Sequence, residues 1–168
     1  MKVVLFGPEA RDLRGEIEKY PGLRIVENDP EVVVSFGGDG ALLAAELRWP
    51  SVPKVPIRNS RRGRRCLPHP PAEVIKRLAG NDLVPTRFAK LECAIRYARE
   101  EEPTCFLTAM NEFNVHMGHV NSAVRLKLWL DEEAYQDGAE ILGDGFVVCT
   151  PFGSTAYYTQ ITRGVFQE

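Results

Sequence analysis

Three groups of residues in this 168-residue chain have side chains and spacing that could do chemistry. The first is Gly37-Gly38-Asp39-Gly40, which sets one carboxylate among glycines directly after the apolar run at 32–34. Glycines let the backbone approach an anion, and a helix starting here adds unpaired N–H groups and the positive end of its dipole. This pattern is typical of a phosphate-binding turn, although Asp-Gly is also common in ordinary turns.

The second group is Asn111-Glu112, which follows the apolar run at 105–107. A carboxylate beside an amide suits ribose hydroxyls and the edge of an adenine. The same dipeptide at the edge of a hairpin would need no ligand, so both interpretations stay open.

The third group begins with Asp144 between two glycines and ends, after an apolar run, in Thr150-Pro151. The small residues that follow leave room for a planar ligand against the backbone, and an aromatic ring can stack on it or hydrogen-bond to it. These following residues are Gly153, Ser154, Thr155, Ala156 and Tyr157.

A basic segment lies between the first two groups. Five arginines fall within residues 58–65, beginning with Arg58-Asn59. Arginine binds phosphate through paired hydrogen bonds and keeps its charge near neutral pH. The segment is a clamp on a polyphosphate, a solvated loop with no ligand, or a patch with some affinity for RNA.

Two styles of periodicity predict the elements that position these groups. Strands at 2–6, 23–26, 32–34 and 52–57 alternate with helices at 9–20, 41–47 and 71–79. That order predicts an α/β domain with a mostly parallel sheet, whose ligands lie beyond the carboxyl ends of the strands. After Gly80 the apolar residues recur every second position, as at 91–97 and 124–130, which predicts half-buried antiparallel strands. We therefore expect domains at 1–80 and 81–168.

The composition limits the class of protein. The residues are 44% hydrophobic and 26% charged, so a packed core is expected. A net charge of −2 disfavours a nucleic-acid binder. We expect no membrane span and no signal peptide, and four scattered cysteines fit a reduced, cytoplasmic protein. The pairs His116/His119 and Cys66/His69 have metal-ligand spacing but no second pair, so no metal site is predicted.

Together, Gly-Gly-Asp-Gly at 37–40, Asn111-Glu112, Gly-Asp-Gly at 143–145 and Thr-Pro-Phe-Gly-Ser-Thr-Ala-Tyr at 150–157 resemble the NAD kinase family in order and spacing. The resemblance covers the chain from about residue 31 to its end. The first element is also shared with lipid kinases and phosphofructokinases. The resemblance implies a kinase that uses ATP or polyphosphate, with Mg²⁺, to phosphorylate the 2′-hydroxyl of the adenosine ribose of NAD. It also implies a dimer or tetramer.

The resemblance implies roles for individual residues. Asp39 would orient or deprotonate the acceptor hydroxyl, and 81–168 would be the NAD-binding domain. The residues expected to contact nucleotides are Gly37, Gly38 and Gly40 on the phosphate side, Arg58 and Asn59 on the basic segment, Asn111 and Glu112 on NAD, Asp144 near the other half of the dinucleotide, and Thr155, Ala156 and Tyr157 near adenine.

The chain departs from the family pattern in four places. Ala41 and Phe152 replace threonines, and the basic segment replaces a glycine-rich loop. The chain ends at Glu168, before the family's further β structure, so we expect the second domain to be incomplete at its C-terminus and another chain to cover its edge. A non-catalytic nucleotide-binding relative, or a kinase for another hydroxyl substrate, stays an alternative; the run at 154–157 argues against a lipid kinase.

Overall fold

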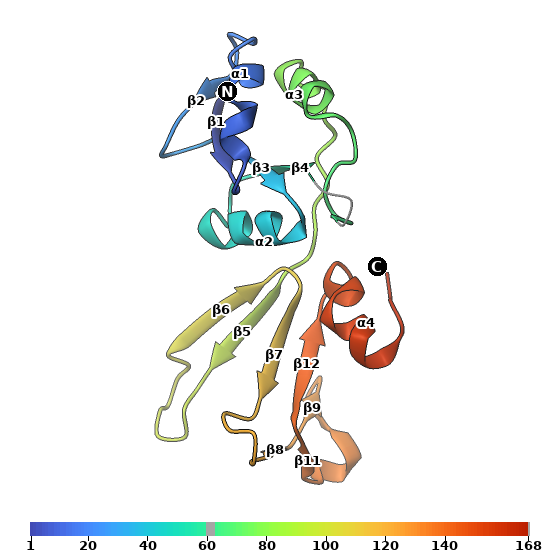
Figure 1. The fold of residues 1–168 in the computed structure, drawn as a ribbon. Coiled ribbons are helices and arrows are strands. Elements are labelled where there is room, and N and C mark those ends of the chain that lie inside the picture. The colour runs from blue at the N-terminus through green and yellow to red at the C-terminus, as the bar shows by residue number, and fades with distance from the viewer. Residues whose placement is uncertain (60–62, 168) are drawn as a thin grey trace. The chain divides into compact units, whose positions relative to one another are not determined.

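The computed structural model describes residues 1–59 and 63–167. The chain forms two compact units, Met1–Thr86 and Arg87–Glu168 (Figure 1). Three residues of the basic segment, 60–62, which include Arg61 and Arg62, lie outside the described residues.

The first unit is built on one parallel sheet. Its strands are β1 (Lys2–Phe6), β2 (Arg24–Ile25), β3 (Val32–Gly37) and β4 (Lys54–Arg58), in the order β2-β1-β3-β4. All three pairings are parallel, so the carboxyl ends of the strands gather at one edge. The predicted parallel α/β fold is confirmed.

Both faces of this sheet are buried, because the side chains of a strand alternate between faces. Val34 and Ile57 face one layer, which is covered by α1 (Arg14–Ile17) and α3 (Pro71–Ala79). Val33 faces the other layer, where it packs with Val4 of β1 and with Ala45 of α2 (Asp39–Arg48). Burying each large apolar side chain contributes roughly 1.5–3 kcal/mol, so the sheet is a rigid support for the turns at the ends of its strands.

The predicted helix at 9–20 is shorter than expected. The structure has a 3-10 helix, η1 (Ala10–Leu13), followed directly by the single turn α1, and residues from Glu18 on form turns. Gly15 is a weak helix former, and no side-chain cap supports either piece. Leu13 and Ile17 are still buried, so the apolar period was correct while the helix length was wrong.

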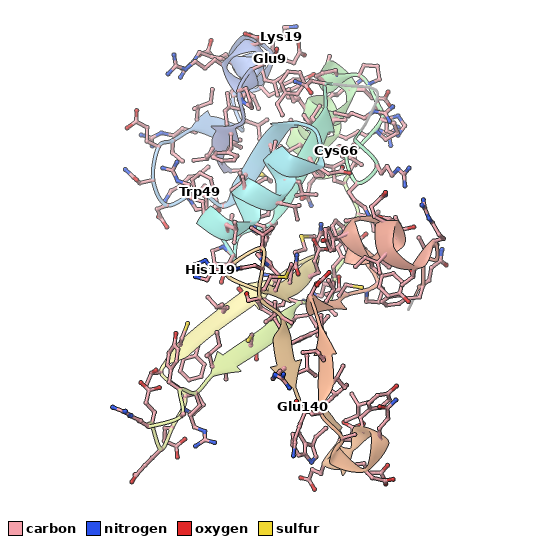
Figure 2. The ribbon with its side chains drawn as sticks, turned by 60° about the horizontal axis from the view of Figure 1, so that its bottom comes forward. Glu9, Lys19, Trp49, Cys66, His119 and Glu140 are labelled. Atoms are coloured by element: carbon pink, nitrogen blue, oxygen red, sulfur yellow. The ribbon has the colours of Figure 1, made fainter. Side chains whose placement is uncertain are left out.

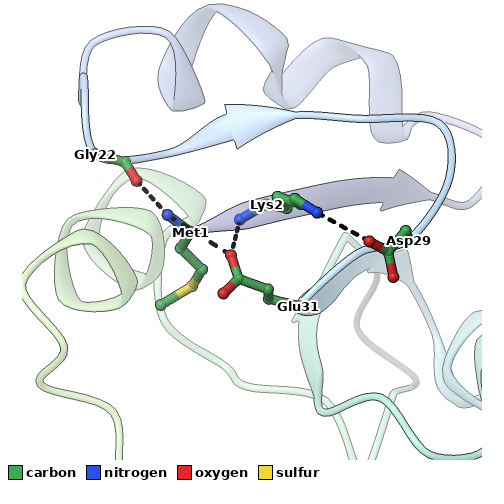
Figure 3. Close-up of polar contacts among 5 residues, drawn as sticks. All are labelled: Met1, Lys2, Gly22, Asp29 and Glu31. Atoms are coloured by element: carbon green, nitrogen blue, oxygen red, sulfur yellow. Dashed lines mark hydrogen bonds and ion pairs between the residues drawn. The ribbon is translucent and has the colours of Figure 1, made fainter.

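Polar contacts hold the amino ends of β1 and β3 (Figure 3). The terminal amine of Met1 donates to the carbonyl of Gly22 at 2.8 Å, and the amide of Lys2 donates to Glu31 Oε2 at 2.5 Å. The Lys2 ammonium lies 2.9 Å from Asp29 Oδ2 and lowers the pKa of that carboxyl. These contacts lie at the edge of the sheet opposite to the glycine turn.

The second unit consists of antiparallel pairs, as predicted. They are β5 (Leu91–Ile95) with β6 (Cys105–Ala109), β7 (Glu112–His116) with β12 (Gly145–Cys149), β8 (Val124–Leu126) with β11 (Ile141–Gly143), and β9 (Trp129–Leu130) with β10 (Glu133–Ala134). The remaining described elements are the 3-10 helices η2 (Tyr135–Gly138) and η3 (Gly153–Thr155), and the helix α4 (Tyr157–Thr162).

One detail of this unit differs from the sequence prediction. The single strand expected over 124–130 is broken between β8 and β9, which pair with different partners. Asp131 and Glu132 take positive φ values of 49° and 72°, which turns the chain directly after β9. The strand β7 pairs with the distant β12 and not with the strand that follows it in the chain.

Much apolar surface of the second unit is exposed. Its buried side chains cluster after β12, at Thr150, Phe152 and Ser154. Large apolar side chains on the strands are exposed, among them Phe106, Trp129, Leu130, Leu142 and Phe146. None of the described helices is both long and apolar enough to cross a membrane.

Candidate functional site

A cavity of about 650 Å³ lies at the carboxyl ends of β1 and β3. Three of the predicted glycines line it, together with the predicted Asn59 from the end of β4. The lining residues are Leu5, Phe6, Gly7, Pro8, Gly37, Gly38, Gly40, Ala41, Ala44 and Asn59. The structure therefore brings the phosphate-side glycines and Asn59 to one cavity.

Gly7 is a fourth glycine at this cavity, and sequence reasoning missed it. Its φ of +126° is a conformation that side-chain-bearing residues rarely adopt, and a Cβ there would overlap the carbonyl oxygen of Phe36. Gly7 directly follows the strand predicted at 2–6, and no role was predicted for it. The signal was its position, because β1 and β3 are parallel neighbours and their following turns must lie together.

The first turn of α2 forms one wall of the cavity. β3 ends at Gly37, Gly38 is the N-cap residue, and Ala41 N–H donates to the Gly38 carbonyl at 3.0 Å. The N–H groups of a helix's first turn lack partners within the helix and carry a partial positive charge. A Cβ on Gly37 would come within 2.8 Å of the Ala41 Cβ, so this wall is open only because glycine stands there.

The carboxylate of Asp39 is fixed by the segment that follows β4. Its Oδ2 accepts the amide N–H of Arg64 at 3.1 Å, and its Oδ1 accepts that of Arg65 at 2.8 Å. The Sγ of Cys66 lies 3.7 Å from the same Oδ1. The predicted catalytic residue thus has a defined orientation, and Cys66 is a contact that sequence reasoning did not foresee.

This segment is itself attached to β4. Leu67 N–H donates to the Pro56 carbonyl at 2.7 Å, and Arg58 N–H donates to the Leu67 carbonyl at 3.3 Å. The Arg58 guanidinium donates to the Gly63 carbonyl at 3.3 Å. Asn59 donates its side-chain amide to Glu9 Oε2 at 2.8 Å, so it joins the two loops beside the cavity.

In the second unit, Asn111 and Glu112 have buried oxygens that lack a partner. Neither Asn111 Oδ1 nor Glu112 Oε2 hydrogen-bonds to any described residue. Burial raises the pKa of Glu112 because its ionised form loses water. A buried acceptor without a partner costs roughly 1–3 kcal/mol, so both oxygens favour a ligand that donates hydrogen bonds.

Thr150 joins this pair to the turn after β12. Its hydroxyl lies 2.6 Å from the Met110 carbonyl, its N–H donates to the Asn111 carbonyl at 2.8 Å, and its Oγ1 accepts the Gly153 N–H at 2.9 Å. A Cβ on Gly153 would overlap the Asn111 backbone. Two motifs that are about 40 residues apart in the chain therefore form one structure.

The other predicted residues of the second unit fall in two places. Thr155, Ala156 and Tyr157 follow the Gly153 turn, where Ala156 N–H donates to the Gly153 carbonyl at 2.8 Å. Tyr157 is 48% exposed, so its ring is available for stacking. Asp144 is exposed at the opposite end of β12. Asp144 lies six residues before Thr150, and at about 3.3 Å per residue the two are about 20 Å apart along the strand. A single chain therefore does not bring Asp144 to the predicted residues that follow β12.

Comparison with known proteins identifies the family of the chain. No protein-family model matches the chain. The NAD kinase of Gemmatimonas aurantiaca is 31% identical over 143 residues, covering 81% of this chain and 47% of that protein. NAD kinase 1 of Bacillus subtilis is 29% identical over 156 residues, covering 86% of this chain and 56% of that protein. The chain belongs to the NAD kinase family.

The fold agrees with this NAD kinase relationship. The crystal structure of yeast NADH kinase complexed with NADH matches 99% of this chain and 52% of that one, with a TM-score of 0.74 at 18% identity. The chain spans about half the length of the curated relatives it matches. The resemblance drawn from the motifs is therefore confirmed at the level of the family and the fold.

This member of the NAD kinase family shows no protein-only metal site in the part of the chain that is described. No group of three or more His, Cys, Asp or Glu side chains gathers there. His116 lies at the end of β7 with its Nδ1 2.8 Å from the Met117 carbonyl. Cys66 contacts Asp39, and His69 faces Glu73 at 3.9 Å.

Proposed function

We propose that the chain transfers a phosphoryl group from ATP to the 2′-hydroxyl of the adenosine ribose of NAD. The observation that carries this proposal is the carboxylate of Asp39. It is fixed in the first turn of α2, the same turn whose glycines line the cavity. Phosphoryl transfer needs positioning and charge stabilisation more than covalent chemistry, and this arrangement supplies both.

The first unit supplies the phosphate side of the reaction. The cavity holds the donor phosphates against Gly37, Gly38 and Gly40, where no side chain blocks the backbone. Asp39 accepts the proton of the acceptor hydroxyl. As that proton leaves, the hydroxyl oxygen bonds to the γ-phosphorus, and the bond from the γ-phosphorus to the bridging oxygen of ADP breaks.

The second unit supplies the acceptor side. Ribose hydroxyls donate to Glu112 and Asn111, which satisfies two oxygens that otherwise lie buried without a partner. Adenine stacks beside Thr155, Ala156 and Tyr157, where the exposed ring and the small side chains leave space. Arg58 and Asn59 border the donor phosphates, Arg58 through charge and Asn59 from the wall of the cavity.

Mg²⁺ would be held mainly by the phosphates of the nucleotide. The ion usually keeps several waters and binds to one or two carboxylates together with substrate phosphates, so a site without a protein metal cluster fits it. When bound, it neutralises charge on the phosphates.

We further propose a homo-oligomer, a dimer or tetramer, in the cytoplasm. Because Asp144 is separated along β12 from the other nucleotide residues of its own chain, we assign it to the dinucleotide held by a second copy. Four free cysteines suit a reducing compartment.

A coupled assay with the purified chain, ATP, Mg²⁺ and NAD tests the proposal. We expect NADP to form, and Asp39→Asn to lower turnover by at least about 100-fold, the usual effect of losing a general base. NADH and polyphosphate, tested in parallel, identify the preferred acceptor and donor. Clean protein that makes no NADP would reject NAD kinase activity, and Asp39→Asn with wild-type turnover would reject the mechanism.

The second candidate is a nucleotide-binding module that does not turn over. The exposed apolar strands of the second unit favour it, because a catalytic site needs a rigid support. Calorimetry that detects binding of ATP or NAD to protein without turnover would support this candidate.

A further inference from the structure

More hydrogen-bond donors approach the Asp39 carboxylate than an aspartate in an ordinary turn requires. Three consecutive residues, Arg64, Arg65 and Cys66, each direct a donor to its one carboxylate. Two of these donors are main-chain amides, and the third is the thiol of a side chain that is only 6% exposed (Figure 2 labels Cys66).

Counted over the described residues, the three donors leave one defined acceptor position. An ionised carboxylate has about four lone-pair positions, two on each oxygen. The Arg65 amide and the Cys66 thiol both approach Oδ1, while the Arg64 amide takes one position on Oδ2. The remaining position is therefore on Oδ2, and a fourth donor would bind there.

We propose that Cys66 is a positioning residue that, with the Arg65 amide, occupies Oδ1 of Asp39, while the Arg64 amide takes one position on Oδ2 and leaves the other to receive the substrate hydroxyl. This inference rests on the proposed function, in which Asp39 accepts the proton. Cys66 does not touch the substrate and acts only through the carboxylate.

The chemistry of Cys66 fits a donor role. Burial, with the neighbouring Asp39 charge, raises the pKa of its thiol to about 11. It therefore keeps its proton at neutral pH and has an S–H to donate. A thiolate in this place would repel the carboxylate.

The attachment to β4 makes this arrangement rigid. Leu67, the residue directly after the three donors, donates its N–H to the Pro56 carbonyl and accepts the Arg58 N–H at its own carbonyl. Gly63, directly before them, accepts the Arg58 guanidinium and packs its backbone near Gly38. The donors are thus held from both sides, so losing one of them changes the aim of the carboxylate more than the path of the chain.

Kinetics of the purified chain test the proposal. We expect Cys66→Ala to lower kcat roughly 3- to 10-fold, the size of one modest hydrogen bond, with the KM values for both substrates unchanged. Cys66→Ser keeps a donor and should stay within about threefold of wild type. Cys93→Ala, a partly buried cysteine on β5 in the other unit, is the matched control and should keep the wild-type kcat.

A second measurement does not depend on activity. Amide proton shifts of Arg64 and Arg65 are recorded by NMR for wild type, Asp39→Asn and Cys66→Ala. Asp39→Asn should move both amide protons upfield because it removes the charged acceptor, and Cys66→Ala should move that of Arg65 because the two share Oδ1.

The outcomes separate the two ideas. An unchanged kcat for Cys66→Ala in folded protein would overturn the positioning role. Amide proton shifts of Arg64 and Arg65 that stay the same in Asp39→Asn would also overturn it. A wild-type chain that makes no NADP would reject the proposed function, and the amide shifts would still decide whether Cys66 and its neighbours hold Asp39.

Discussion

Ser35 and Ser154 are both fully buried, and we expect the same substitution to have opposite effects on stability at the two positions. Ser35 is on β3, 1% exposed, and its Oγ has no hydrogen-bond partner among the described residues. The Oγ of Ser154 lies 2.8 Å from the Pro151 carbonyl and 2.9 Å from that of Phe166. The predictions are for Ser35→Ala and Ser154→Ala.

The magnitude for Ser35→Ala follows from two opposing effects. A buried hydroxyl without a partner costs about 1–3 kcal/mol, which the substitution recovers. Removing one oxygen leaves a void on the order of 15 Å³, which at about 24 cal/mol per Å³ costs about 0.4 kcal/mol. We expect a net gain of about 1–2 kcal/mol. Ser154→Ala instead loses a made hydrogen bond and should cost about 1 kcal/mol.

Urea denaturation followed by tryptophan fluorescence measures the first unit separately. Trp49 packs edge-to-face on Phe6, with ring centroids 5.4 Å apart, and reports this unit. A Trp129→Phe background removes the chain's other tryptophan. Ser35→Ala should move the midpoint to higher urea with an unchanged slope. A loss of 1 kcal/mol or more would refute the reasoning, because it would mean that the Ser35 hydroxyl has a partner.

Three further predictions concern charge and close packing. Burial raises the pKa of Glu112, so the folded chain releases this proton at higher pH than the unfolded chain, and ionised Glu112 destabilises the fold. Glu112→Gln should therefore raise the melting temperature at pH 7.5. The difference in melting temperature should vanish as the pH falls below 4.5, the ordinary pKa of a glutamate side chain. Gly153→Ala would force a Cβ into the Asn111 backbone and should cost about 3 kcal/mol or more in a calorimetric scan, whereas a loss under 1 kcal/mol would show that the turn moves freely. Lys54 forms an ion pair with Glu46, and the two side chains are 8% and 13% exposed. Lys54→Met should therefore cost about 3 kcal/mol of stability, and adding Glu46→Leu should recover most of that loss. Equal stability of the single and double variants would contradict the pairing.

The sequence predicted the first unit well where local signals were strong. The run at 32–34 is apolar throughout, as a strand covered on both faces must be, and glycines follow it at once. The position of the phosphate-side glycines beyond a parallel strand followed from that order alone. Gly7 was missed because its role depends on β1 lying beside β3, and no local pattern in Gly-Pro signals a neighbouring turn.

The contacts of Thr150 and of Asp39 could not be predicted from the sequence for a related reason. Thr150 reaches the Met110 and Asn111 carbonyls across about 40 residues, and Cys66 reaches Asp39 across 27. Each contact depends on strand pairing, β7 with β12 in one case and β3 with β4 in the other. The break after β8 was missed because period-two alternation continues through residues 127–128, which belong to neither strand.

The hydrogen bonds from the main chain to Asp39 have a consequence for how this loop can change in evolution. An amide donor is present in every residue type except proline, so these two hydrogen bonds do not depend on which side chain stands at 64 or 65. An arginine-rich stretch can therefore stand here without disturbing the carboxylate. Among related chains we expect an absence of proline at both positions, and a narrow choice at 66, where the side chain itself makes the contact.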